Sequence, residues 1–210
     1  AIMEAAAQVA QNLGNAGLTL TVPEVNSMGL ALFGGQSLEQ AFAQDYDTVV
    51  IVENDLFRRL PAPQVKAALA KAQTVIVLDH SETETVKQAD IVLSAASFAE
   101  GDGTVVSQEG RAQRFYQVYD PSYYKPEYAI KESWRWLHAI ETGLNGKVIN
   151  WTLLDDVIES VVKNVPVLEA IQDVAPDAGY RVHGLKIARE PRRYSCLLYT
   201  SDAADDSLRV

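Results

Sequence analysis

The sequence has 210 residues, of which 48% are hydrophobic and 22% charged, as in an ordinary globular protein with a sizeable core. The formal net charge of −10 argues against a nucleic-acid-binding surface, because phosphate binding requires clustered lysine and arginine. No apolar run approaches the roughly 20 residues of a membrane-spanning helix, so we expect no direct membrane insertion.

Metal-ligating residues are scarce in this chain. Cys196 is the only cysteine, and the histidines His80, His138 and His183 are far apart in the sequence and show no ligand spacing. A single cysteine cannot build a multi-cysteine zinc or iron–sulfur site. We therefore predict that this segment holds no metal.

The first 120 residues follow the grammar of an α/β fold. The apolar patterns first predict a helix over 1–13, a strand over 18–22 and a helix over 37–44. They then predict three buried strands, over 48–52, 74–78 and 91–93. Helices over 62–72 and 82–88 are predicted between these strands. Ser37 and Gln40 have the spacing of a capping box. The alternation predicts an open parallel sheet with flanking helices over residues 1–120.

The rest of the sequence divides into three parts. Residues 121–175 form a predicted helical extension, with helices over 126–142, from Thr152 with Asp155 as its capping carboxylate, and over 167–174. Residues 176–195 are expected to be extended and to lie on a partner domain. Residues 196–210 lack any period and resemble translated sequencing-adapter DNA, so we expect a disordered artefact. The helical pattern at residue 1 suggests a fragment of a longer protein.

Polar residues follow two of the buried strands. Asp79 ends one strand and the run Glu53-Asn54-Asp55 follows another, and ligands of parallel sheets bind beyond such carboxyl ends. Carboxylates at these positions also serve as caps and turns. The run Asp79-His80-Ser81 contains the residue types of a hydrolase triad, but adjacent side chains on a strand point in different directions. No glycine fingerprint for a dinucleotide or nucleoside triphosphate is present.

Residues 100–115, EGDGTVVSQEGRAQRF, combine three glycines with acidic and basic side chains. This composition is compatible with a phosphate cradle, a substrate loop or a structural corner. The ordered set that includes this stretch resembles the molybdopterin oxidoreductase family; its pieces are Thr83-Glu84-Thr85, Ala89-Asp90, Glu100-Gly101-Asp102-Gly103-Thr104 and Glu109-Gly110-Arg111. Each piece alone is weak, but their order and spacing together are specific.

The resemblance extends to the branch of this family in bacterial NADH-quinone oxidoreductase, respiratory complex I, through the texts QEGRAQRFYQVYDPSYY and ESWRWLHAIETGL. It implies a parent that carries electrons from NADH through 2Fe-2S and 4Fe-4S clusters to quinone and translocates protons. It also implies a peripheral position on the cytoplasmic side of the bacterial inner membrane. The implied partners are other peripheral-arm subunits and the remainder of the same subunit.

For this segment, the resemblance implies a non-catalytic scaffold, because the complex I members of the family are regarded as having lost the pterin. Family catalysts generally hold molybdenum through a cysteine, selenocysteine or similar ligand, and residues 1–195 contain no cysteine. The vestigial cofactor-binding candidates are Asp79, Thr85, Glu100, Gly103, Thr104, Glu109, Gly110 and Arg111. We expect Gly103 and Gly110 to form tight turns, and Glu100, Glu109 and Arg111 to form ion-paired corners. Two alternatives stay open: part of an active molybdopterin-dependent dehydrogenase such as formate dehydrogenase, and a stand-alone small-molecule binding module.

Overall fold

The computed structural model describes residues 2–19, 21–124, 126–145 and 149–174, all of which belong to one compact unit of the chain. The expected extended segment 176–195 and the expected artefact 196–210 lie outside the described residues. Within the described ranges, no helix is long and apolar enough to cross a membrane.

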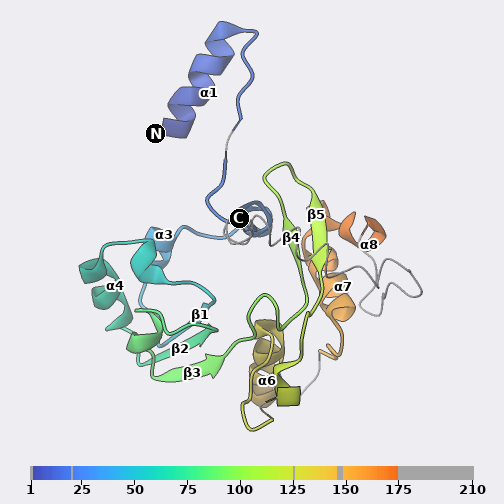
Figure 1. Ribbon diagram of the computed structural model, residues 1–210. Coiled ribbons are helices and arrows are strands. Elements are labelled where there is room, and N and C mark those ends of the chain that lie inside the picture. The colour runs from blue at the N-terminus through green and yellow to red at the C-terminus, as the bar shows by residue number, and fades with distance from the viewer. Residues whose placement is uncertain (1, 20, 125, 146–148, 175–210) are drawn as a thin grey trace, which may run out of the picture. The chain divides into compact units, whose positions relative to one another are not determined.

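A three-stranded parallel sheet organises the α/β part, in the order β1-β2-β3 (Figure 1). The strands are β1 (Thr48–Val52), β2 (Thr74–Asp79) and β3 (Ile91–Ser94). In the register, Ile76 of the central strand lies between Val50 and Ile91. The predicted parallel α/β sheet and the positions of its three strands are confirmed. The predicted burial holds for β2, whereas β1 has one buried residue, Ile51, and β3 has none.

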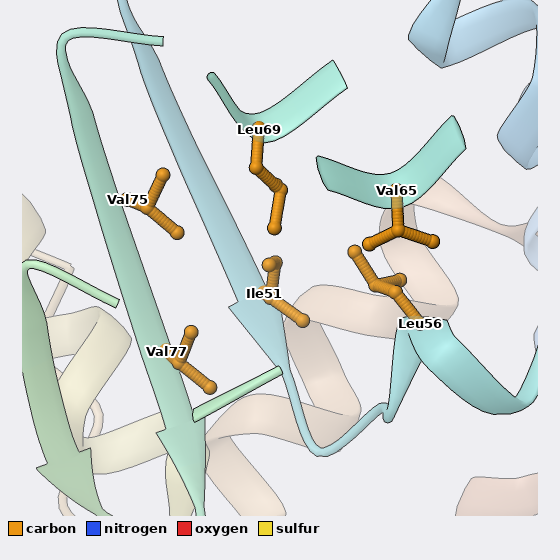
Figure 2. Packing of buried hydrophobic residues seen from close by; sticks show 6 residues of the cluster. All are labelled: Ile51, Leu56, Val65, Leu69, Val75 and Val77. Atoms are coloured by element: carbon orange, nitrogen blue, oxygen red, sulfur yellow. The ribbon is translucent and has the colours of Figure 1, made fainter. Parts of the chain in front are cut away.

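One face of this sheet packs against α4 (Ala62–Leu69) and the 3₁₀ helix η1 (Leu56–Arg58). Figure 2 shows the contact: Ile51, Val75 and Val77 of the sheet meet Leu56, Val65 and Leu69. Val65 and Val77 are fully buried, and burial of one such side chain stabilises the fold by roughly 1.5–3 kcal/mol. This cluster is the main hydrophobic core of the described residues.

The remaining helices are α1 (Ile2–Leu13), α2 (Ser27–Phe33), α3 (Leu38–Phe42), η2 (Val86–Gln88), α5 (Pro121–Tyr124), α6 (Ser133–Asn145), α7 (Leu154–Asn164), η3 (Pro166–Leu168) and α8 (Ile171–Val174). Among them, α2 and α5 were not predicted, the helix predicted over 82–88 is the short η2, and the helix predicted over 167–174 is divided into η3 and α8. The capping box of α3 is confirmed, because Ser37 Oγ accepts from Gln40 N at 3.2 Å and Ser37 N donates to Gln40 Oε1 at 3.0 Å.

Three sequence predictions are wrong: a strand over 18–22, the start of a helix at residue 126, and Asp155 as the cap of α7. The described residues between 18 and 22 form no strand; they precede Pro23, which has no N–H for a ladder. The helix predicted from residue 126 begins at Ser133, because Lys131 instead pairs with Ala95 in a parallel bridge. At α7 the capping carboxylate is Asp156, which accepts from the backbone N–H groups of Thr152 and Leu153 at 2.7 and 2.8 Å.

The stretch from residue 100 to 115 is a β-hairpin, which the sequence analysis did not predict. Strands β4 (Gly103–Val106) and β5 (Ala112–Phe115) pair in antiparallel fashion, and Gly110 turns the chain with a φ of 79°. The expected turn at Gly103 is wrong. This glycine lies in β4 opposite Phe115, and a Cβ atom there would collide with the phenylalanine ring.

Gly110 therefore provides a test of the hairpin turn. We expect Gly110→Val to lower the free energy of unfolding by roughly 1–3 kcal/mol, because a β-branched residue is strained at positive φ. Gln108→Val is the matched control, since it places the same side chain in the same exposed turn without a positive φ. Chemical denaturation measures both. Equal losses in the two variants would contradict the assigned turn geometry.

Candidate functional site

A pocket of about 560 Å³ opens at the carboxyl ends of β2 and β3. Its polar lining includes Asp79, His80, Ser94 and Glu100, and its aromatic lining comprises Tyr119, Tyr128 and Trp136. The structure thus brings together two of the predicted candidates, Asp79 and Glu100, which are 21 positions apart by their residue numbers. Their meeting place is the edge at which parallel sheets bind ligands.

The buried Asp79 carboxylate, with 7% of the residue exposed, holds the turn that leaves the sheet. Its Oδ1 atom accepts a hydrogen bond from the backbone N–H of Ser81 at 3.0 Å and lies 3.5 Å from Nδ1 of His80. Asp79 therefore forms an Asx turn, in which its carboxylate accepts a hydrogen bond from the backbone N–H two residues later in the chain. The geometry agrees with the expectation that these three neighbours do not act as a hydrolase triad.

Glu100 is held by local hydrogen bonds. Its carboxylate accepts from the Tyr119 hydroxyl at 2.6 Å and from the backbone N–H of Ser97 at 2.8 Å. These donors, Tyr119 foremost, lower the pKa of Glu100 from its ordinary value of 4.5. The expected ion-paired corner with the hairpin arginine is not what Glu100 forms.

Thr85 belongs to the core beneath η1 rather than to the pocket. It is fully buried, and its Oγ1 atom accepts from Leu56 N at 2.8 Å and donates to Asp55 Oδ1 at 2.8 Å. The same Asp55 oxygen accepts from Phe57 N at 3.3 Å and caps η1. Thr85 thus ties η1 to the loop that leads to β3.

The remaining candidates lie in two other places. Thr104 lines a separate apolar cavity of about 160 Å³ between α2, β4 and α7, and its buried Oγ1 atom has no hydrogen-bond partner within the described part of the chain. Glu109, Gly110 and Arg111 form the tip of the hairpin. There the Glu109 carboxylate lies 3.9 Å from the Arg111 guanidinium, and both side chains are more than 70% exposed. A solvent-facing pair of this kind contributes under about 1 kcal/mol.

Sequence reasoning missed the aromatic wall of the pocket. The Trp136 ring donates its Nε1–H to the carbonyl of Ser94 at 2.9 Å. The chain around Lys131 lies beside the end of β3, where the backbone N–H of Ala96 donates to the carbonyl of Lys131 at 2.8 Å. The tyrosine-rich sequence before α6 indicates an aromatic cluster. Its position beside β3 could not be predicted, because that position depends on the pairing of Ala95 with Lys131, which are more than 30 positions apart.

A second, smaller pocket of about 260 Å³ shares His80 with the first and is lined by Glu53 and Ser133. Glu53 follows β1 with a φ of 47°, an uncommon conformation for a residue other than glycine. Its backbone N–H donates to Leu78 O at 2.8 Å, and its carboxylate accepts from the Ser133 hydroxyl. Glu53 therefore joins the end of β1 to the start of α6.

The comparison with family models decides the classification. The model described as molybdopterin oxidoreductase matches residues 1–140, two thirds of the sequence. The chain belongs to the molybdopterin oxidoreductase family. The resemblance inferred from the ordered motifs between residues 83 and 111 is thereby confirmed.

The chain is similar to several bacterial proteins. The chain is 51% identical over 202 residues to the G subunit of NADH-quinone oxidoreductase from Escherichia coli strain K12, and the match covers 92% of this chain and 22% of the relative. The protein of the same name from Pseudomonas putida is 51% identical over 203 residues, covering 93% and 22%. That from Salmonella typhimurium is 49% identical over 202 residues, covering 92% and 22%. The chain spans about a fifth of the length of these relatives.

The charge of the pocket at the carboxyl ends of β2 and β3 shows whether its residues suit molybdopterin, the cofactor for which the family is named. A molybdopterin carries a phosphate group, whereas the described residues that line the pocket include two carboxylates, Asp79 and Glu100, and no lysine or arginine. Carboxylates accept hydrogen bonds from the N–H groups of a pterin ring but repel phosphate. The residues present therefore do not fit the anionic part of the cofactor. Among the residues that the structure describes, no group of three or more His, Cys, Asp or Glu side chains is placed to hold a metal ion.

The buried hydroxyl of Thr85 yields a stability prediction. We expect Thr85→Val to lower the free energy of unfolding by about 1–3 kcal/mol, because Leu56 N–H and the Asp55 carboxylate each lose a buried partner. Thr83→Val is the comparison variant. It removes a half-buried hydroxyl that accepts from Val86 N, and water can replace it there, so the loss should be smaller. Equal losses would show that Thr85 is not the buried link.

Glu100 yields a prediction about acid stability. Since its folded pKa is lowered, it stabilises the fold above its unfolded pKa of 4.5, and this contribution is lost as the pH falls through the folded pKa. We expect Glu100→Gln to show a smaller loss of unfolding free energy than the unsubstituted chain between about pH 6 and about pH 3. Tyr119→Phe, which removes the main donor, should change the acid dependence in the same direction. An unaltered acid dependence in Glu100→Gln would contradict this assignment.

Proposed function

We propose that this chain is a non-catalytic scaffold part of the G subunit of a bacterial NADH-quinone oxidoreductase. The parent complex would carry electrons from NADH through iron–sulfur clusters to quinone and translocate protons. The observation that carries the proposal is the 51% identity, over 92% of the chain, to proteins named as the G subunit of NADH-quinone oxidoreductase. The 2Fe-2S and 4Fe-4S clusters would lie in other parts of that protein.

The side-chain contacts support a scaffold role. Asp79 binds the Ser81 amide, Thr85 binds the Leu56 amide, and Glu100 binds Ser97 and Tyr119. Each of these candidates is thus engaged in fixing a turn or a short helix of the fold itself. A catalytic centre would instead need several of them to converge on one reacting atom with their polar groups available.

The proposed setting follows from the same relatives. The partners would be other peripheral-arm subunits of the complex and the remainder of the same subunit. The complex would place this chain at the cytoplasmic side of the bacterial inner membrane, in its peripheral arm. An interface with protein accounts for apolar side chains that the described residues leave exposed, such as Val118, with 79% exposed, and Phe98, with 65%.

A second candidate function is part of an active molybdopterin-dependent dehydrogenase. The pocket at the carboxyl ends of β2 and β3 favours it, since its volume of about 560 Å³ lies within the range of small-molecule sites. The negative charge of Asp79 and Glu100 opposes a phosphate-bearing ligand there. The charge therefore favours the scaffold role over a retained cofactor.

A chimera tests the proposal. In it, the matching segment of the Escherichia coli relative is replaced by residues 1–195 of this chain. We expect the chimeric complex to assemble and to reduce quinone with NADH. Asp79→Asn and Glu100→Gln keep the hydrogen-bond acceptors but remove the charges, so their activity should stay within about twofold of the unsubstituted chimera.

The control is Val77→Asp, which puts an unpaired charge into the core and should abolish assembly. Failure of the unsubstituted chimera to assemble would contradict membership of the complex. An assembled Asp79→Asn or Glu100→Gln complex that has lost activity by about tenfold or more would contradict the scaffold role and favour a retained cofactor site.

A further inference from the structure

The face of the parallel sheet opposite α4 is only partly covered. Side chains alternate along a strand, so Val50 and Val52 point away from the core that holds Ile51. Val50 is 43% exposed, Val52 40%, and Ile91 in register with them 46%, with the half-buried Ile76 between. We call these four residues, Val50, Val52, Ile76 and Ile91, the open sheet face. Parallel sheets are normally buried on both faces, so this face requires a cover.

Helix α1 has an apolar side that no other described element covers. Ile2, Val9 and Leu13 share one side of the helix with small alanines, yet they are 88%, 58% and 63% exposed, and no residue of α1 is buried. A helix of 12 residues is marginal in water unless its apolar side packs on something. The amphipathic pattern of α1 thus calls for an apolar surface.

The chain between these two surfaces is short and anchored. Glu24 forms an ion pair with Arg59, which directly follows η1 and therefore lies one short helix beyond β1. Residues 14–23 connect this anchor to the end of α1. Ten residues reach at most about 33–36 Å, which is enough to carry α1 around the edge strand and keeps it at high local concentration there.

We propose that α1 docks on the open sheet face, with Ile2, Val9 and Leu13 against Val50, Val52, Ile76 and Ile91. A helix of 12 residues is about 18 Å long, and three strands spaced by about 4.8 Å present a face about 10 Å wide. Ala5 and Ala6, on the same side as the apolar stripe, let the helix approach closely. The polar side, with Glu4 and Gln11, stays in water. The docked helix completes the second layer of the α/β sandwich.

Disulfide trapping tests the docking in the 210-residue chain with Cys196→Ser. Val9→Cys combined with Val50→Cys places one thiol on the apolar side of α1 and one on the open sheet face. Gln11→Cys combined with Val50→Cys is the matched control, because Gln11 lies on the opposite side of the helix. We expect an internal disulfide in the first pair to form at least about tenfold faster than in the second under the same oxidant.

Equal rates in the two pairs, or a faster control, would overturn the proposal. Disulfide-linked dimers as the main product would also overturn it and assign the open sheet face to a second copy. Amide hydrogen exchange provides an independent readout in the chain without added cysteines. The α1 amides should be protected and should exchange at least about tenfold faster in Val50→Asp, a change at an exposed position. Unprotected α1 amides, or protection unaffected by Val50→Asp, would contradict the docking.

Discussion

The described structure depends on the central strand β2, which is paired in parallel on both sides. Val75 and Val77 supply its core face, and Leu78 is buried as well. Asp90 fixes the start of β3 against this strand, since its carboxylate accepts from Val75 N at 2.7 Å while its own N–H donates to Val75 O at 2.9 Å. A shift of one residue would turn the buried side chains to the other face, so the apolar pattern and the Asp90 bonds specify one register.

The local features of this sheet could be predicted from sequence, because they depend on neighbours in the chain. Continuous β-branched runs predicted β1 to β3, and the Ser37 and Gln40 pair predicted the cap of α3. The hairpin was missed because Gly103 and the glycine at the turn suggested a loop. In the structure Gly103 admits the Phe115 ring across the hairpin, where that ring stacks on Phe98 at 4.3 Å between centroids.

Features that depend on distant pairing could not be predicted in the same way. The choice of Asp156 over Asp155 at α7 reflects the hairpin, because the Asp155 carboxylate pairs with the buried guanidinium of Arg114 at 2.5 Å. The candidate site divides along the same line. Asp79 and Glu100 meet in one pocket as the sheet topology suggests, whereas Thr85 lies in the core and the hairpin tip carries Arg111.

Three of the family-motif candidates, Asp79, Thr85 and Glu100, use their polar side-chain atoms to fix turns and short helices of the backbone. Asp79 and Glu100 also line the pocket at the carboxyl ends of β2 and β3 with negative charge. The pterin content of the purified complete subunit that carries this chain tests the scaffold role most directly, by oxidation of any bound pterin to a fluorescent product. The scaffold role predicts no stoichiometric pterin, and one pterin per subunit, lost on Asp79→Asn, would contradict it.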